Sequence, residues 1–380
     1  MIQTILLPLD GSVWAEAAVP HAVALASRLG ARLLLVRAVR VRALPGQDAW
    51  TVRARATEVV HAYLARIAAV VQAMSPSLPV GVAMPSGSPC QAILDEATLE
   101  QAGLIVMTSH GATGLTPRGV GRVAAGVMAN GEVPVLLVRP SAPAGAACPV
   151  RPHLADTPWL RQRVRVLVAM DGTPAAKGSL EFVARLGAFV TLSVTLLHVL
   201  RPPGDGSRGA REQGLAFHLR HPQWAMAAYC QRAVTWLGSQ GVAARVEIRW
   251  GDVVRELVHV AQQGEDIVVC GFHVPQTALR WSGDHLMDRI ARAAPVPVLV
   301  VPSRRTEHVS AAGTSGAVSV ACGPGVAKER PAPHPSVAPS PCLPDQDAGG
   351  RWPIMRLNGL APDLNGLAPE DAQGQDQRCG

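Results

Sequence analysis

Aromatic residues are scarce in this sequence, and its cysteines form no recognisable pattern. Phe, Trp and Tyr make up 4% of the 380 residues, while Ala and Val dominate an apolar fraction of 48%. This composition favours helices packed on a parallel sheet over an all-β sandwich. The seven cysteines include no CxxC pair and no recurrent spacing. Neither a disulfide framework nor a zinc site is therefore predicted, and a reducing cytoplasm is expected.

Long hydrophobic runs are absent as well. No apolar run approaches the roughly 20 residues needed to span a bilayer, and the opening MIQTILLPLDGS lacks the charged region and cleavage site of a signal peptide. We therefore expect a cytoplasmic protein without membrane contact. The formal net charge is +7, but no basic cluster with interleaved aromatic residues appears. An arginine-rich composition explains this charge better than binding to nucleic acid does.

The chain contains a long internal repeat. Residues 2–39 and 163–200 each begin with a short apolar run that ends in Asp-Gly, continue with a helical pattern and end in a second apolar run. Further along, LIVMTSH at 104–110 matches DIVVCGFH at 266–273, and VPVLLVRP at 133–140 matches VPVLVVPS at 296–303. The sequence therefore predicts two copies of one structural unit.

This repeat divides the chain into four parts. They are domain 1 (1–140), a Pro- and Ala-rich linker (141–162), domain 2 (163–303) and a tail (304–380) whose low-complexity composition predicts disorder. Domain 1 has short apolar runs near 3–9, 32–39, 79–84, 103–108 and 134–138, separated by helical patterns. Runs that are apolar on both faces predict strands covered by helices on both sides. Each domain is thus expected to be a doubly wound α/β unit with five parallel strands.

Two stretches could hold a ligand at the carboxyl ends of these strands. Asp10, like Asp171 in the second copy, follows the first strand, where a carboxylate can either cap a helix or accept hydrogen bonds from a ribose. The loop TSHGATG (108–114) follows the fourth strand, and its glycines and hydroxyls are suited to an anion. Arg122 lies near the start of the last helix, where amides and a guanidinium favour phosphate. A mobile loop beside an ordinary surface arginine would show the same pattern.

These residues resemble the universal stress protein family, in a tandem arrangement of two domains. The resemblance covers about 1–140 and 163–303 and rests on ILLPLDGS, GARLLLVRAV, TSHGATG and VPVLLV in domain 1, and on VLVAMDGT, VTLLHVL and VPVLVV in domain 2. Nucleotide-binding members carry Gly-x2-Gly-x9-Gly-Ser/Thr. Domain 1 reads Thr108-x2-Gly111-x9-Gly121-Arg122, and domain 2 keeps only Gly271 of this pattern.

The resemblance implies a fold and a site. The fold is the adenine nucleotide alpha hydrolase-like α/β type, and ATP with Mg²⁺ would bind in domain 1, while domain 2 is degenerate. By resemblance, Asp10 would contact the ribose, the backbone near Ala38 the adenine, and the loop and last helix the phosphates. The implied site residues are Asp10, Ala38, Thr108, Ser109, His110, Gly111, Ala112, Thr113, Gly114, Gly121, Arg122 and Val123.

The resemblance also implies partners and a role. The two domains are expected to form an intramolecular pseudo-dimer through the last strands, 134–138 and 298–301, and a further homodimer is left open. The expected role is that of a stress-response regulator that senses ATP through domain 1. The alternative is a nucleotide-independent module of the same fold that docks onto a protein partner. No metal-ligand set or general base is identifiable, so an enzymatic activity beyond slow ATP hydrolysis is not predicted.

Overall fold

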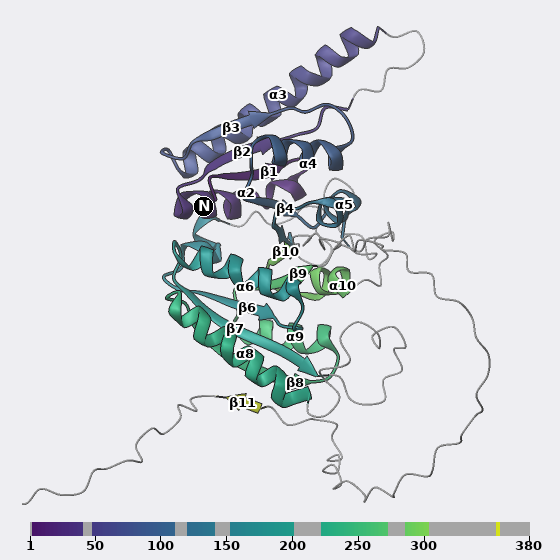
Figure 1. Ribbon diagram of the computed structural model, residues 1–380. Coiled ribbons are helices and arrows are strands. Elements are labelled where there is room, and N and C mark those ends of the chain that lie inside the picture. Colours follow the sequence, from purple (N-terminus) through teal and green to yellow (C-terminus); the bar gives the residue numbers. More distant parts are fainter. Residues whose placement is uncertain are drawn as a thin grey trace, which may run out of the picture. The chain divides into compact units, whose positions relative to one another are not determined.

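The strands of this chain form one large, mostly parallel sheet. The computed structural model describes residues 2–40, 48–110, 120–140, 153–200, 222–272, 286–303 and 355–357. Within them, eleven strands follow the order β11-β8-β7-β6-β9-β10-β5-β4-β1-β2-β3 (Figure 1). Five neighbouring strands come from domain 1 and five from domain 2, so the expected fold class is confirmed.

Domain 1 alternates strands and helices along the chain. Its elements are β1 (Thr4–Pro8), α1 (Val13–Glu16), α2 (Val19–Leu29), β2 (Arg32–Val36), α3 (Ala49–Met74), β3 (Val80–Ala83), α4 (Pro89–Leu99), β4 (Leu104–Thr108), α5 (Arg122–Asn130) and β5 (Val135–Val138). Each predicted strand region contains an observed strand. Ser12 caps α1 and Asp48 caps α3 through side-chain oxygens that accept backbone amides. Gly30, at a φ of 61°, ends α2 in a left-handed conformation.

Domain 2 repeats this order. Its elements are β6 (Val164–Ala169), α6 (Pro174–Gly187), β7 (Leu192–Leu200), α8 (Pro222–Ser239), β8 (Ala243–Trp250), α9 (Val253–Gln262), β9 (Ile267–Phe272), α10 (Leu286–Ala293) and β10 (Val298–Pro302). Thr173 caps α6, and Asp252 caps α9. In the tail, β11 (Met355–Leu357) pairs antiparallel with β8. The other residues of the predicted disordered tail lie outside the described part of the chain.

The two domains join through their last strands. β5 and β10 pair antiparallel, with Leu137 opposite Val298 and Val135 opposite Val300. Within each domain, the neighbouring strands are parallel. Pairing removes two apolar strand edges from solvent. The structure thus contains the intramolecular pairing that the family resemblance implied.

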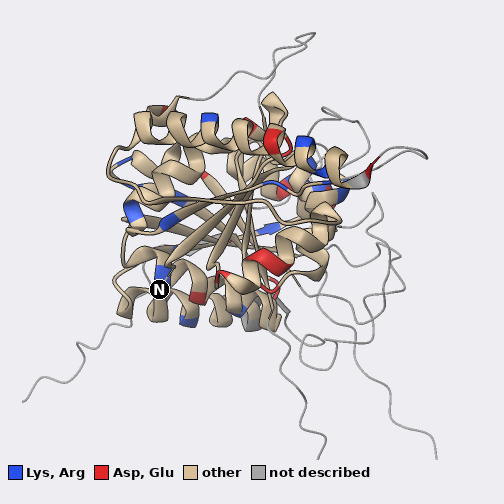
Figure 2. Cartoon of the chain, turned by 90° about the horizontal axis from the view of Figure 1, so that it is seen from above, with Lys and Arg blue, Asp and Glu red and all other residues tan. Residues whose placement is uncertain are grey.

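Helices cover both faces of the sheet, as Figure 2 shows from above. Alternate residues of the strands enter two separate cores: Ile5 and Leu7 belong to a core that includes residues of α2, α3, α6 and α8, whereas Leu6 belongs to one that includes residues of α4, α5, α9 and α10. Both cores run through domain 1 and domain 2. Basic and acidic residues are interspersed on the helices, and neither sign is confined to one face (Figure 2).

The end of the linker packs onto domain 1. Two short 3₁₀ helices, η1 (Leu154–Asp156) and η2 (Pro158–Leu160), precede β6. The Trp159 side chain is 1% exposed within the core, and the Arg28 guanidinium of α2 donates to the carbonyls of Trp159 and Arg161 at 3.1 and 3.0 Å. These contacts fix the chain where it enters domain 2.

The cysteines that the structure describes are free thiols that burial keeps protonated. Cys90, Cys230 and Cys270 are free thiols, and burial raises the pKa of Cys270 to about 12. A thiol that stays protonated is a poor nucleophile. Cys270 therefore acts as a packing residue of the core. In the described residues, no helix is long and apolar enough to cross a membrane.

Acid should destabilise the fold through His21. This side chain of α2 is 7% exposed, and burial lowers its pKa from 6.5 to about 4. Below pH 6.5 the unfolded chain binds a proton that the folded chain does not bind until about pH 4, so stability falls as the pH falls through this window. We expect a loss of about 2–3 kcal/mol.

The measurement is urea denaturation of wild type and His21→Gln between pH 8 and pH 4. Because other groups also titrate, the stability difference between the two proteins isolates the contribution of His21. That difference should shift in favour of the variant as the pH falls. A difference that is constant over the whole range would contradict the prediction.

Candidate functional site

The strand order of domain 1 reverses between β1 and β4. The chain builds β2 and β3 on one side of β1, then crosses to place β4 and β5 on the other. Ligands of open α/β sheets bind at such a switch point, beyond the carboxyl ends of the strands. Asp10 follows β1, and the segment from Thr108 to His110 ends β4. The topology therefore brings the two predicted stretches to the same edge of the sheet.

Asp10 organises the turn that leaves β1. Its Oδ1 accepts hydrogen bonds from the amide and the hydroxyl of Ser12, at 2.9 and 2.6 Å. Gly11 has a φ of 89°, which favours glycine. Asp171 and Thr173 make the same two contacts in domain 2, at 2.9 and 2.6 Å. In both domains the aspartate thus bonds to the N-cap residue, Ser12 or Thr173, and does not itself cap the helix. Both aspartates are exposed at the surface.

A cluster of charged residues that sequence reasoning missed lies beside this turn. The Arg37 guanidinium packs on Gly11 so closely that a Cβ there would be 2.6 Å from its nearest nitrogen. The same guanidinium stacks 4.8 Å from the ring centre of Tyr63 on α3. Arg66 lies 5.3 Å from that ring centre and pairs with buried Glu16 at 2.6 Å. Arg37 therefore places a positive charge at the turn that Asp10 forms.

The backbone at Ala38 lies just beyond the end of β2. The Arg37 amide donates to the Ala83 carbonyl at 3.1 Å, and the Val39 amide donates to the Pro85 carbonyl at 2.8 Å. Because successive backbone groups of an extended strand point in opposite directions, the amide and carbonyl of Ala38 point toward the β1 side. There, β1 has already ended at Pro8. The position predicted to meet a base thus presents backbone groups toward the switch point.

The polar side chains at the end of β4 bond to their own segment. Thr108, Ser109 and His110 are each less than 9% exposed. The Thr108 hydroxyl donates to the His110 carbonyl at 2.6 Å, and the Ser109 hydroxyl lies 3.0 Å from His110 Nδ1. These contacts hold the segment to itself. A ligand here would meet backbone groups rather than these hydroxyls.

Among the described residues, no side chain caps the start of the last helix of domain 1. Gly121 is its N-cap residue, and its amide donates to the Ser109 carbonyl at 2.7 Å, which ties the helix start to β4. Arg122 and Val123 in the first turn are exposed. The predicted residues Gly111, Ala112, Thr113 and Gly114 lie outside the described residues. The first-turn amides of α5 therefore form the described part of the predicted anion site.

The glycine that domain 2 keeps has a packing role. Gly271 matches Thr108, and a Cβ on it would lie 2.3 Å from the backbone carbon and oxygen of Ala175 in α6. The first turn of α6 thus rests directly on β9. In domain 1, Thr108 carries a side chain and the corresponding helix is interrupted between α1 and α2. Gly271 consequently allows helix–strand contact, and α6 occupies the space above it.

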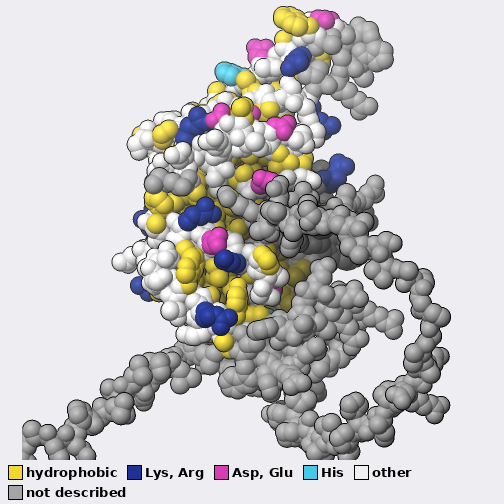
Figure 3. Space-filling model, in the orientation of Figure 1, with side chains coloured by type: hydrophobic (Ala, Val, Ile, Leu, Met, Phe, Trp, Pro, Cys, Tyr) yellow, Lys and Arg dark blue, Asp and Glu magenta, His cyan; other side chains and the backbone are white. Residues whose placement is uncertain are grey.

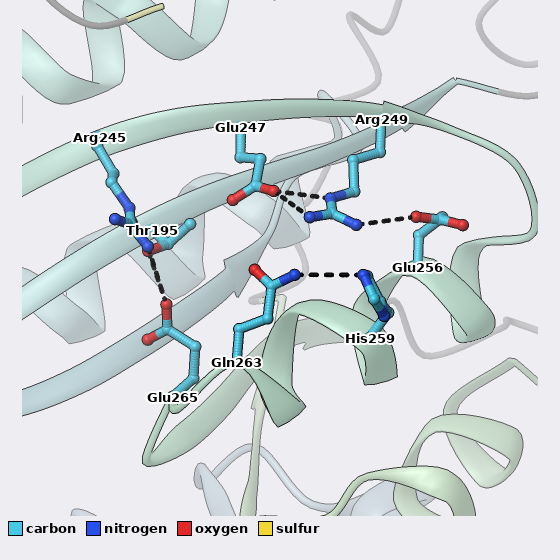
Figure 4. Close-up of polar contacts among 8 residues, drawn as sticks. All are labelled: Thr195, Arg245, Glu247, Arg249, Glu256, His259, Gln263 and Glu265. Atoms are coloured by element: carbon cyan, nitrogen blue, oxygen red, sulfur yellow. Dashed lines mark hydrogen bonds and ion pairs between the residues drawn. The ribbon is translucent and has the colours of Figure 1, made fainter. Parts of the chain in front are cut away.

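Domain 2 also carries a buried ion cluster near the end of β8. The Arg249 side chain is 4% exposed and contacts Glu247 at 2.6 Å and Glu256 of α9 at 3.3 Å (Figure 4). Nearby, the Thr195 hydroxyl donates to Glu265 at 2.8 Å, and burial raises the pKa of the Glu265 carboxyl. The residues of Figure 4 all come from domain 2, and their side chains form hydrogen bonds and ion pairs with one another. This arrangement is typical of a structural network.

The fold and the switch-point residues define a doubly wound α/β protein with a candidate anion site in its first half. The model of the universal stress protein family matches residues 1–139 and 163–302. The chain therefore belongs to the universal stress protein family, with two such domains in tandem. No curated protein matches it significantly.

Solved structures share the two-domain fold. A universal stress protein from Archaeoglobus fulgidus DSM 4304 matches with a TM-score of 0.57 and 19% identity, over 79% of this chain and 96% of that one. The functionally unknown protein PA1789 from Pseudomonas aeruginosa PAO1 matches with a TM-score of 0.50 and 15% identity, over 80% and 93%. At these identities the comparison shows a common fold.

Proposed function

We propose that domain 1 binds ATP and that the chain is a stress-response regulator whose domain 2 has lost the site. The observation that carries this proposal is the start of α5 at the switch point, where Gly121 is the N-cap, Arg122 is exposed and no described side chain caps the helix. Such a terminus offers amide donors and a favourable dipole to phosphate. Domain 2 differs, since α6 covers its equivalent of Thr108.

The other groups at this edge suit the rest of the nucleotide. The exposed carboxylate of Asp10 would accept hydrogen bonds from the ribose, and the backbone of Ala38 would contact the adenine edge. Arg37, held on Gly11 and the Tyr63 ring, would add positive charge beside the ribose and phosphates. No cluster of three or more potential metal ligands occurs among the described residues. Mg²⁺ would therefore be bound chiefly by the phosphates.

Calorimetric titration of the full chain with ATP and Mg²⁺ tests the proposal. We expect saturable binding at one site per chain, with affinity lowered about tenfold or more by Asp10→Ala. Gly111→Val should also weaken binding. Asp171→Ala is the matched control because Asp171 makes the same two turn contacts in domain 2, and it should leave the affinity unchanged. No heat at millimolar ATP, or equal effects of the two aspartate variants, would overturn the proposal.

Failure of the titration would favour the second function, a module that docks onto a protein partner. The first half of α3 supports it, because Trp50 and Val59 are 77% and 65% exposed. Figure 3 shows hydrophobic side chains on the surface at this end of the helix. An exposed tryptophan such as Trp50 is a side chain that protein interfaces favour. In that case ATP would have no effect on either domain.

A further inference from the structure

Domain 2 makes a direct contact with the anion-binding segment of domain 1. The Asp288 side chain of α10 accepts a hydrogen bond from the Val120 amide at 2.7 Å. Val120 is the residue before the N-cap of α5. The Asp288 carboxylate is 1% exposed, and its other oxygen accepts from the Arg292 guanidinium at 2.6 Å. This buried carboxylate is therefore both charge-paired and hydrogen-bonded.

The contact fixes α5 without using the donors of its first turn. The Gly121 amide is bonded to the Ser109 carbonyl of the same domain, and the Val120 amide is bonded to Asp288. Two consecutive amides are thus held by two different domains. The first-turn amides from Arg122 onward have no acceptor within the helix, as at any helix start. Asp288 therefore positions the first-turn donors of α5 without bonding to them.

Domain 1 cannot make the equivalent contact with domain 2. At the offset that relates Val133 to Val296, the counterpart of Asp288 is Ala125, which has no acceptor in its side chain. Domain 2 therefore holds the start of α5 in domain 1, and domain 1 provides no such contact to domain 2. This direction agrees with a difference between the domains, because α6 lies directly against Gly271 in domain 2.

We propose that Asp288 is a positioning residue of domain 2 that holds the phosphate-binding helix start of domain 1. This inference rests on the proposed ATP site. It gives domain 2 a role in ligand binding although its own site is degenerate. Loss of the carboxylate would free Val120 and the entry to α5, so the donors would have to be ordered at the moment when a phosphate binds.

The test combines hydrogen exchange of the nucleotide-free full chain with ATP titration. Asp288→Ala should speed exchange of the Val120 amide about tenfold or more, with β1 and β6 unchanged, and should weaken ATP binding about tenfold. Asp288→Asn keeps an oxygen acceptor and should restore most of the protection and affinity. Arg289→Ala is the control, since Arg289 is on the same helix but pairs at 3.2 Å with Asp252 of α9.

The two readouts separate this inference from the proposed function. If wild type does not bind ATP, the proposed function fails, and unchanged exchange at Val120 in folded Asp288→Ala would still reject the positioning role. If wild type binds ATP and Asp288→Ala changes neither exchange nor affinity, the inference is wrong while the ATP site stands. Exchange that rises throughout the chain in Asp288→Ala, but not in Asp288→Asn, would also reject a local role.

Discussion

Arg249→Met should lower the free energy of unfolding by about 3–5 kcal/mol. The guanidinium neutralises Glu247, whose side chain is 5% exposed, through contacts of 2.6 and 2.7 Å, and it also reaches Glu256 at 3.3 Å. Methionine fills a similar volume but leaves the Glu247 carboxylate buried without its partner. A buried carboxylate that loses its cation costs far more than a surface ion pair contributes. Urea denaturation followed by circular dichroism measures the loss.

Two further variants test the cause of this loss. The double change Glu247→Leu with Arg249→Met removes both charges, and it should recover at least half of the lost stability. Lys177→Met is the surface control because Lys177 and Glu181 are 73% and 55% exposed and 3.9 Å apart, and it should cost less than about 0.5 kcal/mol. A double variant as unstable as Arg249→Met would show that the charge pairing is not the source.

Gly271→Ala should cost at least about 3 kcal/mol, since the added methyl group would lie 2.3 Å from the backbone of Ala175. A flexible side chain could rotate away, but the backbone of α6 can make room only if the whole helix moves off β9. The effect should appear as a lower urea midpoint, together with faster hydrogen exchange in α6. The proposed ATP binding by domain 1 should be unaffected in the folded fraction.

Gly178→Ala in the middle of α6 is the matched control. Nothing lies within 4 Å of a Cβ at this position, and alanine favours helix by about 1 kcal/mol over glycine. Gly271→Ala, which pushes against α6 from β9, should thus lower the stability. Gly178→Ala, which lies within α6, should raise it. A Gly271→Ala protein as stable as wild type would contradict the close packing of α6 on β9.

Most of the fold could be predicted from the sequence because it depends on local patterns. Apolar runs on both faces mark the strands of a covered parallel sheet, and the Asp-Gly turns at Asp10 and Asp171 mark where helices begin. The repeat adds independent support, since a pattern that occurs twice, at offsets of 161 and 163 residues, has little chance of being accidental. Pairing of the last strands came from the family resemblance.

The polar contacts of the site could not be predicted in the same way. Arg37 and Tyr63 come from different elements, and their stacking depends on how α3 crosses the sheet. Val120 and Asp288 are 168 residues apart in sequence, and no local pattern connects them. Gly271 fits both a phosphate loop and a close helix contact, because both need the absence of a side chain. The backbone of Ala175 decides between them.

The antiparallel pairing of β5 with β10 has a consequence for how this protein can evolve. In a symmetric homodimer each substitution appears on both sides of the interface, so the surface must always be complementary to itself. Here the partners are joined covalently, and their association is unimolecular and independent of protein concentration. A change such as aspartate at 288 with alanine at 125 can then arise on one side alone. Joining the two domains in one chain thus leaves one half free to specialise in the proposed ligand contact while the other specialises in holding it in place.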